Sequence, residues 1–239
     1  MTRGRERGLQ AIIFDFDGVI ANSEPLHLRA FQQALGDEGH FLGAEEYYAR
    51  YLGYDDLGVF EAIGRDRGLP WDGRHVGDLV ARKGLKLQQM MQAGGVLFPG
   101  AADFVRSAAA VVPIAIASGA LRHEIDEIVE AAGLTPLFTC IVASGDTPES
   151  KPSPAPYRLA FERLCAATGR ALDRARCVAI EDSRWGLESA WGAGLRCVGV
   201  TTSYPADELP RAELVAGGLG ALTLSALDVL VSDDAQESR

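Results

Sequence analysis

Continuous apolar runs rich in β-prone residues recur along the chain and predict buried strands. Segments with apolar residues at helical spacing separate these runs over the C-terminal portion. Such an alternation predicts an α/β fold with a parallel sheet and right-handed crossovers. The predicted strands cover residues 11–14, 112–117, 138–142, 177–180, 197–200 and 214–216. The helices predicted among them cover residues 101–110, 121–132, 157–167, 185–193 and 225–231, with a short helix near Glu208.

A long stretch between the first and second strands shows helical patterns without strand alternation. Turn-forming residues flank it, Asn22-Ser23 before and Gly94-Gly95 after. We therefore predict two domains: residues 1–22 with 96–239 as an α/β core, and residues 23–95 as an inserted all-helical unit. Within the insert, helices are expected over about residues 25–35, 45–52, 59–67 and 76–91.

Two acidic residues end the first strand. Asp15 and Asp17 follow its apolar run, and Gly18 lets the chain turn sharply after them. Residues i and i+2 of an extended segment point the same way, and ligands of open α/β sheets bind at the carboxyl ends of the strands. Asp15 is therefore a candidate nucleophile and Asp17 a candidate general acid and base. The competing interpretation, an Asp-x-Asp that only caps a turn, is disfavoured directly after a buried strand.

Polar residues also follow the later strands. Glu181 and Asp182 form a second acidic strand end, and two such ends predict an all-oxygen site suited to Mg²⁺. Ser118 and Gly119 offer a hydroxyl and an amide to an anion at a helix N-terminus, although Ser118 could also cap that helix. Lys151 precedes a proline-rich loop that fixes its backbone. Its ammonium could hold carboxylates and phosphoryl oxygens together.

Charge and cysteine usage narrow the class of protein. A net charge of -10 argues against non-specific binding to nucleic acid or to anionic membranes, but it permits an anionic small substrate. The first apolar run is too short for a signal peptide core or a membrane span. The cysteines lack the close spacing of zinc clusters and are interpreted as free thiols of a reducing cytosol, so a cytoplasmic location is expected. They are Cys140, Cys165, Cys177 and Cys197.

Four motifs, in this order, resemble those of the haloacid dehalogenase-like superfamily: Asp15-Phe16-Asp17-Gly18-Val19, Ser118-Gly119, Lys151-Pro152 and Glu181-Asp182-Ser183. The resemblance covers most of the chain and is closest to the branch that holds β-phosphoglucomutase and phosphoglycolate-type phosphatases. It implies a Rossmann-like core flanked by helices, with the helical insert as a cap. It also implies a Mg²⁺-dependent phosphatase that hydrolyses a small phosphorylated metabolite through an aspartyl-phosphate. We expect a monomer or a weak homodimer.

The resemblance assigns roles to individual residues of the core. Ser118, the Gly119 amide and Lys151 would bind the non-bridging phosphate oxygens. Asp182 would contact the metal more directly than Glu181. The residues implied around Mg²⁺ are Asp15, Asp17 through its carbonyl, Glu181 and Asp182.

Three further basic residues are candidates for substrate binding. Arg122 lies one turn into the helix after Ser118 and is expected at the phosphate, with surface pairing to Glu124 or Asp126 as the alternative. His27 and Lys83 match cap residues that lie near the substrate in the β-phosphoglucomutase branch, although lone basic residues on helices are more often packed or solvated.

Competing functions remain open on the sequence. A sugar-phosphate mutase would return the phosphoryl group to its substrate. The mutase branch carries a cation in the cap loop that here reads Gly53-Tyr54-Asp55-Asp56, and acids at that place disfavour a second phosphate. A dehalogenase of this superfamily lacks the second aspartate, so Asp17 argues against that activity. A non-catalytic binding module is disfavoured because all four motifs are present.

Overall fold

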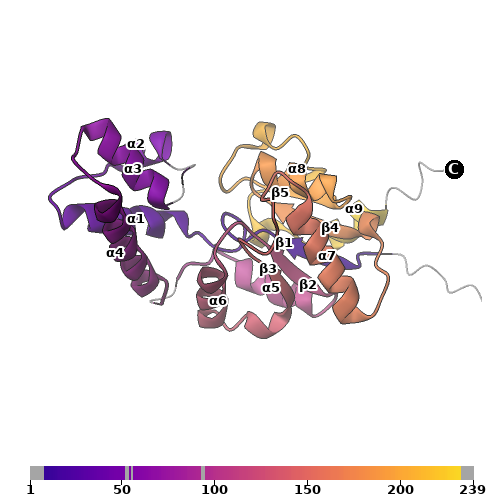
Figure 1. The fold of residues 1–239 in the computed structure, drawn as a ribbon. Coiled ribbons are helices and arrows are strands. Elements are labelled where there is room, and N and C mark those ends of the chain that lie inside the picture. Colours follow the sequence, from indigo (N-terminus) through magenta and orange to yellow (C-terminus); the bar gives the residue numbers. More distant parts are fainter. Residues whose placement is uncertain (1–7, 52–53, 55, 93–94, 233–239) are drawn as a thin grey trace, which may run out of the picture. The chain divides into compact units, whose positions relative to one another are not determined.

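The structure is a computed structural model that describes residues 8–51, 54, 56–92 and 95–232. The chain forms two compact units (Figure 1). One comprises Met1–Asn22 together with Val96–Arg239, and the other comprises Ser23–Gly95. We call them the core unit and the helical unit.

A six-stranded parallel sheet forms the centre of the core unit, in the order β3-β2-β1-β4-β5-β6. The predicted α/β fold with a parallel sheet is confirmed. The second strand begins later than predicted, at Ile114, because Pro113 has no amide to donate to a ladder. The strands are β1 (Ala11–Phe14), β2 (Ile114–Ala117), β3 (Phe138–Val142), β4 (Cys177–Glu181), β5 (Arg196–Val200) and β6 (Leu214–Ala216).

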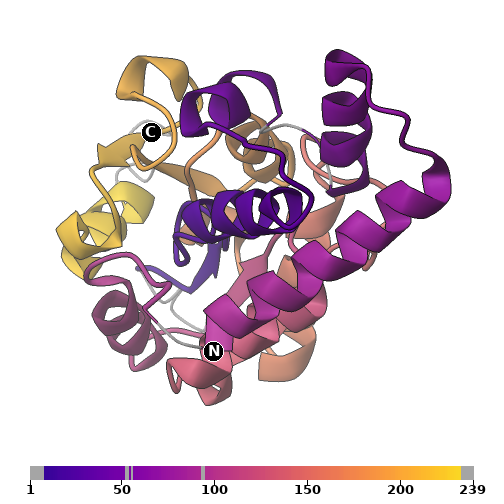
Figure 2. The same cartoon turned by 90° about the vertical axis from the view of Figure 1, so that its left-hand side faces the viewer.

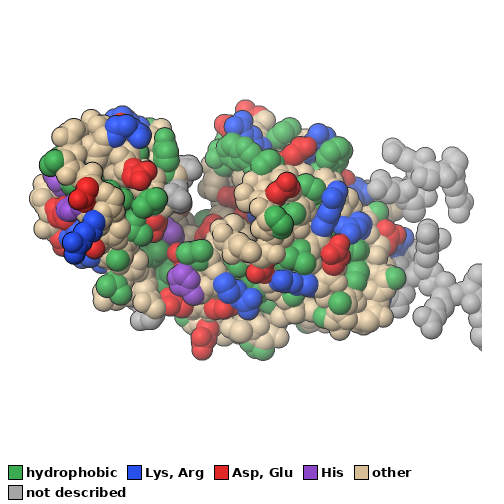
Figure 3. Space-filling view, viewed as in Figure 1, with side chains coloured by type: hydrophobic (Ala, Val, Ile, Leu, Met, Phe, Trp, Pro, Cys, Tyr) green, Lys and Arg blue, Asp and Glu red, His purple; other side chains and the backbone are tan. Residues whose placement is uncertain are grey.

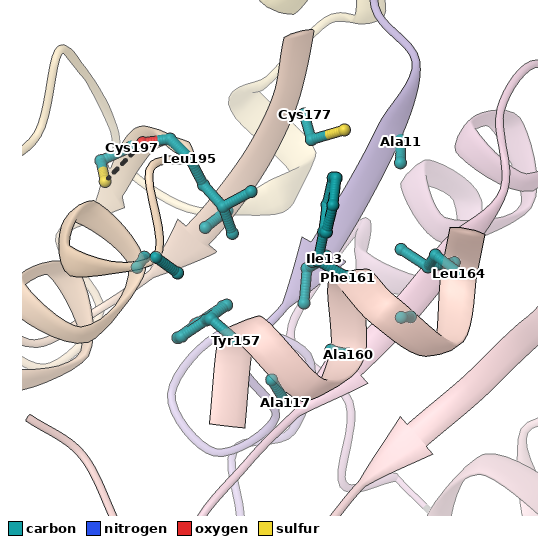
Figure 4. Close-up of a cluster of buried hydrophobic side chains, with 14 of the residues drawn as sticks. Ala11, Ile13, Ala117, Tyr157, Ala160, Phe161, Leu164, Cys177, Leu195 and Cys197 are labelled. Carbon is teal, nitrogen blue, oxygen red and sulfur yellow. Dashed lines mark hydrogen bonds between the residues drawn. The ribbon is translucent and has the colours of Figure 1, made fainter. Parts of the chain in front are cut away.

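Helices cover both faces of this sheet, because alternate residues of each buried strand point to opposite faces. Figure 4 shows Ala11 and Ile13 of β1 beside Tyr157 and Leu164 of α7 (Ala155–Thr168). On the other face the Phe14 ring meets that of Phe104 of α5 (Ala101–Ala109) edge-on, with ring centroids 6.2 Å apart. The helices are α5 (Ala101–Ala109), α6 (Arg122–Ala131), α7 (Ala155–Thr168), α8 (Arg184–Gly192) and α9 (Leu224–Ser232). A short 3-10 helix covers Ala206–Glu208.

The direction in which strands are added to the sheet changes between β1 and β4. From β1 the chain builds outward through β2 and β3, and then returns to the opposite side of β1 with β4. The crevice at such a switch point, at the carboxyl ends of the strands, is where open α/β sheets bind ligands. Here the amide of Asp15 donates to the carbonyl of Ile180 at 2.9 Å, so the acidic ends of β1 and β4 lie directly next to each other.

The two connections to the helical unit are joined to each other within the core unit. The amide of Asn22 donates to the carbonyl of Val96 at 2.7 Å, and that of Phe98 donates to the carbonyl of Ile20 at 3.0 Å. A bridge between Ala21 and Leu97 lies between them. The segment directly after the turn that carries Asp17 is therefore held in place by pairing with the second connection.

The helical unit consists of α1 (Glu24–Gly36), α2 (Ala44–Arg50), α3 (Asp56–Arg67) and α4 (Gly73–Gln92). Its core is aromatic: the Phe31 ring lies 5.2 Å from that of Phe60 and 5.6 Å from that of Tyr47. The long helix α4 (purple in Figure 2) packs against α1. The helices α3 and α4 begin about one turn before the predicted starts, because their first turns bury no apolar side chain and apolar spacing does not reveal them.

A lysine lies at the centre of the helical unit rather than on its surface. Lys83 is fully buried, and its ammonium donates to both carboxylate oxygens of Asp56, at 2.7 and 2.9 Å. It also lies 3.0 Å from Nδ1 of His27 and above the Phe31 ring. Burial, and secondly the Lys83 charge, lower the pKa of His27 to about 4. His27 is therefore neutral at pH 7, with Nδ1 accepting and the proton on Nε2.

The surface of the described residues mixes apolar and charged side chains. Trp185 and Trp191 have exposed fractions of 42% and 52%. Basic and acidic side chains are interspersed on the face shown in Figure 3 rather than gathered into a basic patch. Within the described part of the chain, no helix is both long and apolar enough to cross a membrane. The cysteines are free thiols there, as predicted.

The buried pair in the helical unit gives a stability prediction. Asp56→Asn leaves the Lys83 ammonium buried without its counter-ion, so we expect a loss near the lower end of the ~3–5 kcal/mol typical of breaking a buried pair, since Asp56 is itself partly exposed. Asp66→Asn is the matched control, because its partner Arg50 is largely exposed and such pairs contribute about 0–1 kcal/mol. Urea unfolding measures both, and equal losses would contradict the assignment.

Candidate active site

Asp15 lies at the carboxyl end of β1, where a lysine from another part of the chain holds it. The Lys151 ammonium donates to Oδ1 of Asp15 at 2.7 Å and to Oε1 of Glu181 at 2.6 Å. These carboxylates end neighbouring strands, β1 and β4. The lysine therefore bridges the two acidic strand ends that the sequence singled out.

Glu181 is completely buried and saturated with hydrogen bonds. In addition to Lys151, its Oε1 accepts from the Tyr157 hydroxyl at 2.9 Å. Its Oε2 accepts from the amides of Asp182 and Ser183 and from the Ser183 hydroxyl. A Cβ on Gly186 would lie 1.9 Å from this carboxyl group. Glu181 is thus held in one orientation, with its oxygens already engaged by protein donors.

Asp182 is the neighbouring acid and is also buried. It packs against the turn after β1 so closely that a Cβ on Gly18 would lie 1.9 Å from its Oδ2. Gly18 also has a φ of +79°, a conformation that side chains disfavour. The close approach of Gly18 to Asp182 brings the turn of the first motif against the end of β4.

Asp17 lies in the turn directly after Asp15. Phe16 between them is fully buried and lies at a bend after the end of β1, while Asp15 is buried and Asp17 is partly exposed. The turn is closed by the Gly18 amide, which donates to the Ala21 carbonyl at 2.9 Å. The structure thus places both acids at the end of β1, and the shared orientation of their carboxylates stays a prediction.

Ser118 and Gly119 follow β2, the strand on the other side of β1. The alternative role of Ser118 as a helix cap is wrong, because α6 begins at Arg122 with Leu121 in the cap position. Instead, the Ser118 hydroxyl accepts from the Ala120 amide at 3.0 Å, and a hydroxyl that accepts can also donate. The space next to Gly119 is open, with nothing within 4 Å of where a Cβ would lie.

The three further basic candidates have partners within their own units. Arg122 is 57% exposed and its Nε donates to both carboxylate oxygens of Asp126 at 2.9 Å, which is the surface alternative left open by the sequence. His27 and Lys83 belong to the helical unit, where they contact each other. Lys83, expected at the substrate on the strength of resemblance, has no exposed surface in the unit as described.

Like charges dominate the electrostatics of the strand edge. Burial, with the neighbouring Glu181 charge, raises the pKa of Asp15 well above its usual range, and Lys151 only partly opposes this. Burial and Glu181 likewise raise the pKa of Asp182 to about 6. Burial alone would lower the pKa of Lys151, but the charges of Asp15 and Glu181 outweigh it and raise that pKa. The three carboxylates thus compete for one ammonium.

A family model described as haloacid dehalogenase-like hydrolase matches residues 9–194, which include all four motifs. The chain belongs to this family. The predictions of an enzyme of the haloacid dehalogenase-like type and of its Rossmann-like fold are confirmed.

Relatives of known name and structure agree with this assignment. Protein CbbY of Rhodobacter capsulatus is 31% identical over 93% of this chain and 99% of its own length. Phosphoglycolate phosphatase of Yersinia pestis is 26% identical over 83% of each chain. A crystal structure of a CbbY variant from Rhodobacter sphaeroides, in complex with xylulose-(1,5)bisphosphate, is 30% identical, with a TM-score of 0.76 over 92% of this chain and 99% of that one.

The donor set of this haloacid dehalogenase-like hydrolase fits a hard cation. Ligand atoms of Asp15, Glu181 and Asp182 all lie within 4.8 Å of one another. If all three were ionised beside Lys151, the cluster would hold more negative than positive charge, and a divalent cation would balance it. Magnesium prefers such oxygen ligands. Because the Glu181 oxygens are occupied by protein donors, Asp15 and Asp182 are the better candidates for direct contact.

Two residues that shape this site were not singled out from the sequence. Tyr157 looks like an ordinary first-turn residue of α7, yet its hydroxyl reaches Glu181. Gly186 looks like a poor helix residue of α8, and only the adjacent Glu181 carboxyl explains it. A glycine inside a predicted helix directly after an acidic strand end is the one cue that was available.

Gly186 therefore provides a test of the packing around Glu181. In Gly186→Ala the new methyl group must displace the Glu181 carboxyl, so we expect destabilisation of about 1–3 kcal/mol despite the better helix propensity of alanine. Gly77→Ala in α4 is the control, because nothing lies within 4 Å of its Cβ position and the substitution should be neutral or stabilising. Thermal unfolding measures both. An unchanged melting temperature in Gly186→Ala would refute the crowding.

Proposed function

We propose that the protein is a Mg²⁺-dependent phosphatase that hydrolyses a small phosphorylated metabolite through an aspartyl-phosphate on Asp15. One observation carries the proposal. A carboxylate that ends the central strand is held by a buried ammonium beside two further acids at the switch point of the sheet. Phosphoryl transfer depends mainly on such positioning and charge neutralisation.

Asp15 is suited to act as the nucleophile. Lys151 contacts its Oδ1, so the other oxygen can attack the phosphorus in line while the carboxylate stays fixed. The ester bond then breaks, and the phosphoryl group is held on Asp15. In the second step water attacks phosphorus, phosphate leaves and the Asp15 carboxylate is restored. Fixing a nucleophile in this way removes much of the entropic part of the barrier.

Asp17 is suited to manage the protons of both steps. It is partly exposed and lies two residues after Asp15, at the carboxyl end of the same strand. We assign it the protonation of the leaving oxygen in the first step and the deprotonation of water in the second. General acid–base catalysis of this kind contributes on the order of 10²–10⁴ in rate.

The remaining residues would stabilise the phosphoryl oxygens. The Ser118 hydroxyl and the Gly119 amide follow β2 and can each donate one hydrogen bond. The Lys151 ammonium donates beside them, at the end of β1. A bound Mg²⁺, held by Asp15, Asp182 and the Asp17 carbonyl with Glu181 behind them, would neutralise negative charge on the transferring group. Arg122 would join this set only by leaving its pair with Asp126.

Relatives support a phosphorylated sugar or sugar-derived acid as the substrate class. The structure of the CbbY variant contains a five-carbon sugar bisphosphate, and another relative is named for the phosphate ester of a small hydroxy acid. A hexitol phosphatase of Escherichia coli is 29% identical over 94% of this chain. What these proteins share is a small polyol or hydroxy acid that carries phosphate.

A sugar-phosphate mutase remains the second candidate, because Lys83 and His27 match that branch. The structure changes one argument against it. Asp56 was expected as an uncompensated acid in the cap loop, but it pairs with Lys83; Gly53 and Asp55 lie outside the described residues. The same pair also neutralises Lys83, which therefore gives no free positive charge to a second phosphate. Hydrolysis is therefore still favoured over mutase action, now because Lys83 is neutralised by Asp56 rather than because Asp56 repels a second phosphate.

Replacement of the nucleophile tests the reaction. Asp15→Asn should lower phosphate release from a generic aryl phosphate by about 10³-fold or more, because an amide cannot form the intermediate. Asp173→Asn is the control. Asp173 lies before the amino end of β4, whereas the site lies at the carboxyl end, so this variant should keep the wild-type rate. A folded Asp15→Asn variant with near-normal turnover would exclude Asp15 as the nucleophile.

Metal dependence and product analysis test the rest. EDTA should abolish activity, Mg²⁺ should restore it, and Zn²⁺ should substitute poorly at an all-oxygen site. With β-glucose 1-phosphate and a trace of the 1,6-bisphosphate, we expect free phosphate without isomerisation to glucose 6-phosphate. Full activity in EDTA would contradict the metal assignment, and rapid isomerisation with little phosphate would favour the mutase.

A further inference from the structure

A loop after β5 contacts the site from a third strand and has no role in the function described so far. The Thr202 hydroxyl donates to the carbonyl of Gly18. The Ser203 hydroxyl faces the carboxylate of Asp182 and keeps the pKa of that acid below the value that burial alone would give. Two adjacent hydroxyls of one loop therefore contact the two elements that meet at Gly18, the turn after β1 and the acid after β4.

These contacts converge on one crowded point. A Cβ on Gly18 would lie 1.9 Å from Oδ2 of Asp182 and 3.0 Å from Oγ of Ser203. Small movements of any one group are therefore transmitted to the others, since close-packed atoms have no free space to absorb them.

The contact with Gly18 also determines where the Asp17 carbonyl points. A peptide unit is planar, with its carbonyl and its amide on opposite sides. The Gly18 amide is bound to the Ala21 carbonyl at 2.9 Å, which sets the plane that contains the Asp17 carbonyl. Thr202 sets the next plane through the Gly18 carbonyl. Since glycine is the most flexible residue in the chain, both planes need such external bonds to stay fixed.

We propose that Thr202 and Ser203 are positioning residues for the catalytic cation, with Ser203 orienting the Asp182 carboxylate and Thr202 locking the Asp17–Gly18 turn. This inference rests on the proposed function, because it concerns the ligands of the same metal. A hydroxyl that faces one carboxylate oxygen leaves the other to face the cation. Outer partners of this kind typically affect metal affinity or activity by about 10–100-fold.

The loop is anchored independently of the site, so its side chains can be tested one at a time. The Thr201 amide donates to the Ala216 carbonyl of β6 at 2.9 Å, and the Thr201 hydroxyl faces the same carbonyl at 3.5 Å. Ser203 is exposed and Thr202 partly exposed. Removing either hydroxyl should therefore leave the backbone of the loop in place.

The experiment compares Ser203→Ala and Thr202→Val with Thr201→Val, a control of the same chemistry in the same loop. Calorimetric titration with MgCl₂ in the absence of substrate gives the Mg²⁺ dissociation constant, and kinetics give the Mg²⁺ concentration for half-maximal rate. We expect about 10-fold or greater weakening of Mg²⁺ binding in the first two variants, recovery of most of kcat at saturating Mg²⁺, and no change in Thr201→Val. Ser203→Thr and Thr202→Ser, which keep the hydroxyl, should bind nearly as the wild type does.

The outcomes separate this inference from the proposed function. Wild-type Mg²⁺ affinity in both Ser203→Ala and Thr202→Val, or losses no larger than in Thr201→Val, would overturn the positioning role while leaving the phosphatase assignment intact. A wild-type protein that binds no Mg²⁺ would overturn both. If one variant fails to fold, the other decides, because the two hydroxyls contact different groups.

Discussion

The ammonium of Lys151, buried between Asp15 and Glu181, is the interaction on which the site depends. The sheet forces the two carboxylates together because β1 and β4 are neighbouring parallel strands that both end in acids. Such proximity is unfavourable for buried like charges. A single cation within hydrogen-bond distance of both makes the arrangement possible, and it comes from a loop more than a hundred residues after β1 in the chain.

A second buried ammonium, in the helical unit, shows what is distinctive about the first. Lys83 faces one carboxylate and a neutral histidine, so its charge is balanced within the unit. The Lys83–Asp56 pair therefore has a structural role within the helical unit. Lys151 faces two carboxylates, with Asp182 close by, and with all three acids ionised the cluster would hold more negative than positive charge. This excess of negative charge is the physical reason to place a divalent cation beside Asp15.

Much of the core could be predicted from the sequence because its information is local. The strand at Ala11–Phe14 and the acids after it are adjacent in the chain. One short stretch of sequence therefore predicts both the buried strand and the carboxylates at its end. Other features depend on distant partners. Nothing local to Lys83 says that Asp56 and His27 enclose it, and a basic residue on a helix is usually solvated. Arg122 was expected at the phosphate, but its nearest acid is Asp126, one turn along the same helix. The roles of Tyr157, Thr202 and Ser203 likewise depend on which loops meet across the sheet.

The central claim is that Asp15 carries the phosphoryl group between two chemical steps. The most direct test is rapid acid quenching of the enzyme during turnover of a ³²P-labelled aryl phosphate with Mg²⁺, followed by peptide mapping of the labelled protein. The account predicts a hydroxylamine-sensitive acyl phosphate on the peptide that contains Asp15, with label that disappears as substrate is exhausted. Label on another residue, or steady turnover with no labelled protein at any quench time, would contradict it.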